Sequence, residues 1–92
     1  MTKKEAEKYK AHLLGWIVAF DSKKISREFK FKDFKKTMVF VNKVADIAEA
    51  EGHHPDMLVS YGKVAIELST HAIGGLSEND FIVASKINRL IK

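Results

Sequence analysis

The sequence predicts an α+β domain with the element order αββαββα, in which three helices pack on one face of a four-stranded antiparallel sheet. Three segments, at the beginning, the middle and the end of the chain, carry apolar residues at helical spacing. Between them lie short segments that are rich in strand-forming residues and come in pairs joined by turns. Strands arranged as hairpins pair antiparallel. The length of 92 residues predicts a single domain, residues 1–92.

The first helix is expected at residues 2–14, where Thr2 and Glu5 have the spacing of a capping box. Gly15 follows as the expected left-handed residue at the end of this helix. Residues 16–20 and 25–31 then read as the strands of a first hairpin, with a turn at residues 21–24. Trp16 is expected in the core or in the wall of a pocket.

The second helix is expected at residues 33–51 and has two neighbouring apolar stripes. The first consists of Phe34, Met38, Val41, Ala45 and Ala48, and the second of Thr37, Phe40, Val44 and Ile47. Together they cover roughly half the circumference, whereas a helix on one sheet needs an apolar arc of about 100°. We therefore expect a second partner for this helix: Phe40, Val44 and Ile47 would join copies of the chain.

The second hairpin is expected at residues 57–61 and 63–70, and a last helix at residues 77–91. Ser77 and Asp80 have capping-box spacing, which favours a capping role for Asp80 over a catalytic one. If the fourth strand extends as far as His71, its alternation points this histidine away from the core.

Composition restricts the possible functions. The net charge is +4, but the lysine pairs are dispersed among acids, which is typical of a solvated surface. Attraction to nucleic acid is the alternative reading, and we do not expect it. The chain has no cysteine, its start lacks the apolar segment of a signal peptide, and its apolar runs are too short to span a membrane. A cytoplasmic protein is expected.

Three of the four histidines lie at the expected ends of secondary structure elements. His53 and His54 follow the long helix, and His71 follows the fourth strand. Imidazole titrates near neutral pH, so these side chains have the chemistry of a general acid–base set. Glu49 lies one helical turn before His53 and could orient an imidazole. The structural alternative is that a histidine caps the helix or bonds a backbone carbonyl.

Zinc is the competing interpretation of the same residues, because three histidines and a carboxylate are suitable zinc ligands. Their spacing contains no pair of histidines one helical turn apart, and adjacent histidines rarely bind one ion. We therefore expect no metal.

Several motifs resemble one known family over nearly the whole chain, the pterin-4a-carbinolamine dehydratases. They are Gly15-Trp16, the run from Phe29 to Phe34, Val44-Ala45, Ala48-Glu49, His53-His54-Pro55, Tyr61, Val64, the run from Leu68 to His71, Gly75-Leu76-Ser77 and Asp80. The sequence departs from the family pattern at Asn79, where some members have arginine, and at Gly52, where an acid is common.

The resemblance implies a dehydratase that converts 4a-hydroxytetrahydropterin to quinonoid dihydropterin without a metal or organic cofactor, in recycling of the pterin cofactor. It places the catalytic histidines at His53, His54 and His71, with Glu49 in support. Further substrate contacts are expected at Gly52, Pro55, Ser69, Thr70 and Ala72, with Trp16 and Asp80 as possible supporting residues. It also implies dimers through sheet edges and tetramers through the long helix. The alternative is a non-catalytic interaction module of the same fold that binds a protein or nucleic acid.

Overall fold

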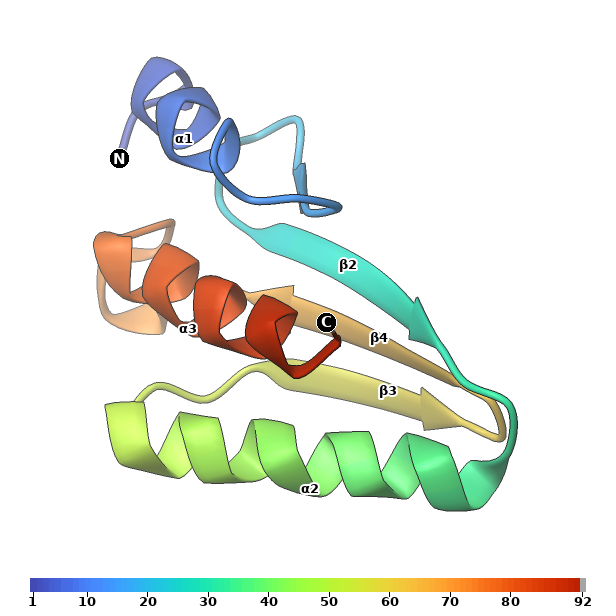
Figure 1. Ribbon diagram of the computed structural model, residues 1–92. Coiled ribbons are helices and arrows are strands. Elements are labelled where there is room, and N and C mark those ends of the chain that lie inside the picture. Colours follow the sequence, from blue (N-terminus) through green and yellow to red (C-terminus); the bar gives the residue numbers. More distant parts are fainter. Residues whose placement is uncertain (92) are drawn as a thin grey trace.

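The computed structural model describes residues 1–91 and confirms the predicted fold class. The helices are α1 (Lys3–Lys10), α2 (Phe34–Glu51) and α3 (Glu78–Asn88), with short 3₁₀ turns η1 (His71–Ile73) and η2 (Arg89–Ile91). The strands are β1 (Ile17–Val18), β2 (Ile25–Lys30), β3 (Asp56–Ser60) and β4 (Lys63–Leu68). They pair antiparallel in the spatial order β1-β2-β4-β3 (Figure 1).

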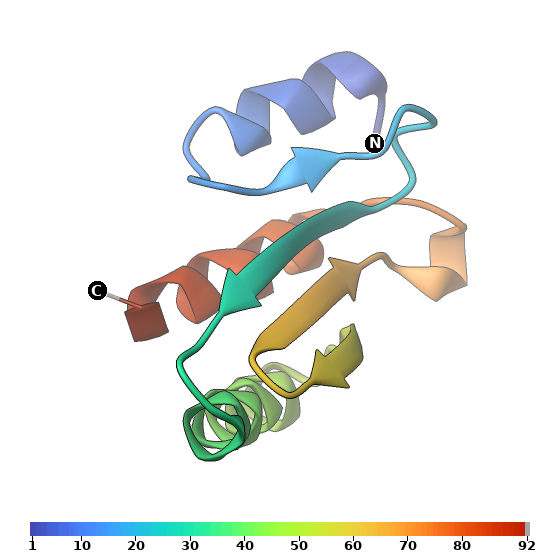
Figure 2. The ribbon, with the colours of Figure 1, turned by 90° about the vertical axis from the view of Figure 1, so that its right-hand side faces the viewer.

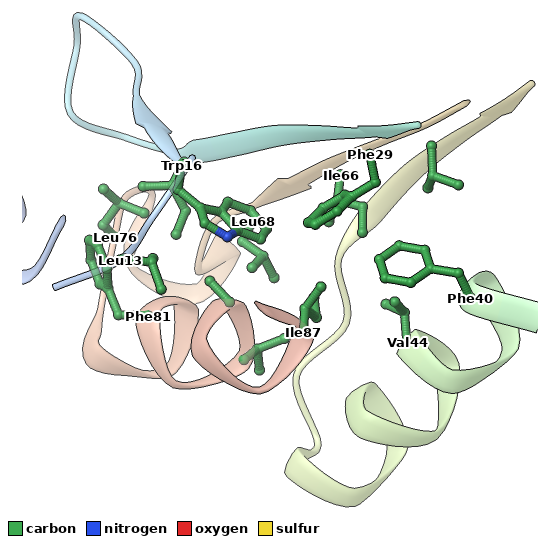
Figure 3. Packing of buried hydrophobic residues seen from close by; sticks show 14 of the residues in the cluster. Leu13, Trp16, Phe29, Phe40, Val44, Ile66, Leu68, Leu76, Phe81 and Ile87 are labelled. Carbon is green, nitrogen blue, oxygen red and sulfur yellow. The ribbon is translucent and has the colours of Figure 1, made fainter. Parts of the chain in front are cut away.

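The helices enclose one core against one face of the sheet, and among residues 1–91 they leave the other face open (Figure 2). Phe29 of β2 and Leu68 of β4 point from the sheet towards Ile87 of α3 (Figure 3). Val44 of α2 lies in the same cluster, and Leu13 extends the cluster to the chain that follows α1. The alternation predicted for β4 is therefore confirmed, because its even-numbered residues 64, 66 and 68 are all buried.

The first helix is shorter than predicted. The Thr2–Glu5 capping box is present, but α1 ends at Lys10 with Ala11 as its C-cap. The following turns leave Leu13 buried and bring the chain to Gly15, which has a positive φ of 84°. Gly15 therefore does not cap the helix. A Cβ here would lie 2.6 Å from the guanidinium carbon of Arg27, so the glycine permits a close approach of the chain to β2.

The predicted contact surface on the second helix is wrong. Phe40 and Val44 are 4% and 0% exposed, because α2 turns this stripe towards the sheet. Thr37, one helical turn before Phe40, is fully buried on the same stripe, and its hydroxyl lies 2.8 Å from the carbonyl oxygen of Asp33 and 2.9 Å from that of Tyr61. Ile47 is partly buried against the same core. The apolar residues that α2 leaves half-exposed lie elsewhere, and they include Phe34 and Val39.

The second hairpin and the last helix agree with prediction in type and differ at their ends. β4 ends at Leu68, so the strand does not reach His71, which instead begins the exposed turn η1. The Ser77–Asp80 capping box at the start of α3 is present as predicted. β3 is an edge strand, and its Leu58 is 69% exposed. No helix within residues 1–91 is long and apolar enough to cross a bilayer.

Candidate functional site

The His53-His54 pair lies in a loop that the end of α2 creates. Gly52 adopts the left-handed conformation as the C-cap of α2, and its N–H bonds the carbonyl oxygen of Ala48. The backbone N–H of His53 also donates to that carbonyl, at 3.1 Å. Gly52 turns the chain here, and Pro55 cannot continue a helix. The two histidines therefore lie in a non-helical segment that leads to β3.

Asp80 is the residue that connects this loop to the rest of the site. Its side chain is fully buried, and its Oδ1 lies 2.5 Å from Nε2 of His53. Its Oδ2 accepts hydrogen bonds of 2.9 Å from the hydroxyl of Thr70 and from the backbone N–H of Ser77. One carboxylate therefore joins the loop after α2, the segment after β4 and the first turn of α3.

His71 belongs to the segment that Thr70 anchors. Thr70 pairs with Gly75 through a 2.7 Å backbone hydrogen bond, which closes a small loop around η1. His71 is exposed at the beginning of this loop. Figure 1 shows the end of α2, the loop into β3 and the beginning of α3 at the same end of the molecule. His53 and Thr70, the residue before His71, therefore lie close together through their shared contact with Asp80.

His54 has a different environment from its neighbour. Its Nε2 is hydrogen-bonded to Oε2 of Glu49, and both side chains are exposed, at 61% and 77%. The side chain of His53 is 15% exposed. Glu49 thus orients His54 and not His53, contrary to the expectation from helical spacing. The reason is that the chain turns at Gly52, which places the second histidine beside the last turn of α2.

A second ion pair holds the two helix ends together close to the loop. Nζ of Lys86, on α3, is paired with Oε2 of Glu51, the last residue of α2. This pair links the last turn of α3 to the end of α2 at a partly exposed position of the surface.

Most of these residues were identified from the sequence, and Asp80 and Trp16, the two possible supporting residues, have the capping and core positions that were expected. Asp80 does cap α3, yet it also binds His53, which the capping-box spacing could not reveal. Trp16 lies away from the site, because it is 1% exposed and its Nε1–H donates to Oδ1 of Asn88 at the far end of α3. Within residues 1–91, no group of three histidine, aspartate or glutamate side chains could hold a metal ion.

Another hollow of the surface lies away from these residues. It has a volume of about 650 Å³ on the open face of the sheet, and its lining includes Ile17, Glu28 and Leu58 but no histidine. The titratable groups at loop ends, and not this hollow, therefore define the candidate site.

Comparison with known proteins identifies relatives over the whole chain. The family model for pterin 4 alpha carbinolamine dehydratase matches residues 1–90. The mitochondrial pterin-4-alpha-carbinolamine dehydratase 2 of Arabidopsis thaliana is 50% identical over 93 residues, which cover 98% of this chain and 50% of that protein. A Nitrosomonas europaea protein provisionally named for the same activity is 53% identical over 89 residues, covering 96% of this chain and 77% of that protein.

A solved structure extends the likeness to three dimensions. The crystal structure of a transcriptional coactivator/pterin dehydratase from Brucella melitensis has a TM-score of 0.91 and 35% identity, and covers 97% of this chain and 95% of that chain. This agreement includes the element order and the helix-covered antiparallel sheet described above.

Proposed function

This chain belongs to the pterin-4a-carbinolamine dehydratase family, and on that basis we propose that it removes water from 4a-hydroxytetrahydropterin to give quinonoid dihydropterin. It would be a hydro-lyase of the cytoplasm that recycles the pterin after aromatic amino acid hydroxylation. The observation that carries this proposal is the buried Asp80 carboxylate, which joins the His53 loop to the segment that bears His71.

The reaction needs two proton transfers and no change of oxidation state. The 4a-hydroxyl takes a proton and leaves as water, while the neighbouring ring nitrogen gives up a proton. We assign these transfers to His53 and His71, since they come from different segments and can lie on either side of a flat ring. Imidazoles can serve as both acid and base near neutral pH. The residues supply this chemistry without a metal or an organic cofactor.

His54 and Glu49 are assigned to substrate binding. They form an exposed hydrogen-bonded pair next to His53, whose side chain is mostly buried, and they can contact a ligand that His53 reaches. The pterin would lie against residues 52–55 and 69–72, with contacts from Gly52, Pro55, Ser69, Thr70 and Ala72. Trp16 takes no part in this assignment, because it is buried at the other end of α3.

The test is an assay of the purified protein for acceleration of 4a-carbinolamine dehydration. General acid–base help contributes about 10²–10⁴-fold, so His53→Ala and His71→Ala should each lower kcat by about that factor. His54→Ala should act mainly on KM, because it removes a binding contact. His12→Ala is the matched control, since this fourth histidine is exposed in the turns after α1 and should leave kcat and KM unchanged. Near wild-type kcat in both His53→Ala and His71→Ala would contradict the assignment.

Self-association through the β3 edge is the second part of the proposal. An edge strand presents unpaired backbone groups that can pair with another strand. Leu58 and Tyr61, on and just after β3, are each 69% exposed, and Val59 is 37% exposed. A dimer would pair β3 with β3 of a second copy, and the exposed side of α2 would join dimers into a tetramer. The same surface would serve the alternative function, a non-catalytic interaction module, which an inactive wild-type protein would favour.

A further inference from the structure

We propose that Asp80 is a positioning residue that keeps a proton on Nε2 of His53, so that Nδ1 is the ring nitrogen that exchanges the proton of the reaction. This inference rests on the proposed function, because it specifies how one of the proposed proton-transfer groups works. It gives a definite role to an aspartate that the sequence resemblance names only as a possible supporting residue.

The first step concerns the charge of Asp80. A buried carboxylate is costly unless hydrogen-bond donors surround it. Oδ2 receives two donors, the hydroxyl of Thr70 and the backbone N–H of Ser77, so this oxygen acts as an acceptor. The N-terminus of α3 adds the positive end of the helix dipole, which favours a negative charge at this position. We therefore assign the carboxylate form to Asp80, because both contacts of Oδ2 are with donors.

The second step concerns the proton between Asp80 and His53. Their atoms Oδ1 and Nε2 are 2.5 Å apart, which is a short hydrogen bond. An ionised carboxylate can only accept, so Nε2 must donate. When the imidazole is neutral, its second nitrogen, Nδ1, then carries the lone pair. When the imidazole is protonated, Nδ1 carries the added proton, and Nε2 keeps its own proton and still donates it in the hydrogen bond to Asp80.

The consequence is that one nitrogen serves both directions of proton transfer. His53 accepts a proton at Nδ1 as a base and returns it from Nδ1 as an acid. The Nε2 hydrogen bond also fixes the rotation of the ring, so Nδ1 keeps its direction through the cycle. Because Oδ2 is bonded to Thr70, the residue before His71, Asp80 orients His53 relative to the segment of the other proposed proton-transfer group.

The substitution Asp80→Asn tests this directly, because the structure dictates how the amide must sit. The backbone N–H of Ser77 can only donate, so the amide oxygen must take the place of Oδ2. The NH₂ group then faces Nε2 of His53, where it needs an acceptor. His53 can provide one only if its proton moves to Nδ1, which removes the lone pair needed for the reaction. The variant keeps the size of the side chain and its hydrogen bond from Ser77, but it moves the proton of the neutral His53 ring from Nε2 to Nδ1.

The experiment combines steady-state kinetics with NMR of ¹⁵N-labelled histidine rings, assigned with the His53→Ala spectrum and recorded where the His53 ring is neutral. We expect Nε2–H in the wild type and Nδ1–H in Asp80→Asn. We also expect kcat to fall by about 10²-fold or more, as loss of a general base predicts, while KM changes little. The control is Ser77→Ala, which removes the hydroxyl that contacts the Thr70 hydroxyl but keeps the Ser77 backbone N–H and the Asp80 carboxyl group. It should lower stability without changing the tautomer.

Each outcome decides the inference. An Nδ1–H tautomer in the wild type overturns it, and so does a folded Asp80→Asn protein with wild-type kcat or with Nε2–H retained. If Asp80→Asn does not fold, the wild-type spectrum decides: a downfield Nε2–H resonance protected from exchange supports the inference, and its absence overturns it. If the wild-type protein lacks dehydratase activity, the proposed function fails, but the two tautomers still show whether Asp80 sets the proton position.

Discussion

The position of Phe40 provides a sharp test of how α2 is oriented. The ring is 4% exposed and lies between two other rings, with centroids 4.8 Å from Phe29 and 4.9 Å from Phe31. Replacing a buried phenylalanine by alanine costs about 3–5 kcal/mol, which includes the cavity left behind. Domains of this size have a total stability of about 5–15 kcal/mol. Phe40→Ala should therefore remove a large part of the free energy of unfolding.

Urea denaturation at two protein concentrations measures this loss. With a slope of about 1–3 kcal/mol per molar urea, the midpoint should fall by about 1 M or more at either concentration. Val39→Ala is the matched control, because Val39 neighbours Phe40 on α2 but is 49% exposed and should cost less than about 1 kcal/mol. If Phe40→Ala lowered the oligomer mass and left the unfolding of the dissociated chain unchanged, Phe40 would be an interface residue, and α2 could not pack this stripe against the sheet.

Three further predictions concern assembly, acid stability and metals. Leu58→Lys should lower the mass measured by light scattering. Leu14→Lys should not, because it alters a leucine that is outside β3 and even more exposed, at 81% against 69%; equal masses for both variants would exclude the β3 edge. The hydrogen bonds of the Thr2 capping box, chiefly that from its backbone N–H, lower the pKa of Glu5. Its contribution to stability is therefore present above the unfolded-state pKa and lost as the pH falls, so Glu5→Gln should destabilise the protein at neutral pH and not in acid; an equal loss at both pH values would contradict this. Protein purified without added metal should contain no stoichiometric zinc and should keep its activity in chelator. Stoichiometric zinc together with loss of activity in chelator would revive the zinc interpretation.

Periodicity predicted the elements well because it reports local structure. Local residues determine the capping boxes at Thr2 and Ser77 and the alternation of β4, and the structure contains all of these features. The end of α1 was missed because the residues after Lys10 carry no strong stop signal, and the chain leaves the helix to bury Leu13. Gly15 was correctly expected to have a positive φ, but its contact with Arg27 depends on a strand far along the chain.

The two stripes of α2 show a limit of the same method. The spacing identified both stripes, and it gave no reason to choose which one faces the sheet. In the structure the stripe that faces the sheet is the one that contains Thr37, whose hydroxyl contacts a backbone carbonyl in the turn of the β3–β4 hairpin. A threonine in an apolar stripe is a weak core candidate in the sequence, whereas in the structure it is fully buried and its hydroxyl contacts a carbonyl outside the helix.

The candidate site was predictable in its residue types and less so in its connections. Loop position grouped His53, His54 and His71, but the pairing of Glu49 with His54 follows from the turn at Gly52 and not from helical spacing. Asp80 was named as a possible supporting residue, but its contact with His53 was not foreseen, because a capping box accounts for an aspartate at that position. The box uses only Oδ2 of the carboxylate, and the other oxygen was free to take a partner from another segment.

This division of one carboxylate couples the folding of α3 to the assembly of the site. The start of a helix has unpaired N–H groups that must find acceptors, so Asp80 has to be a buried acceptor whether or not the protein is an enzyme. Once its Oδ2 is fixed by Ser77 and Thr70, its Oδ1 can point in one direction only, and His53 occupies that direction. The position of the proposed proton-transfer nitrogen is then as well defined as the helix start itself. It follows that a loop histidine can be held precisely by a rigid element, and that loss of the Asp80 carboxylate should affect catalysis before it affects the fold.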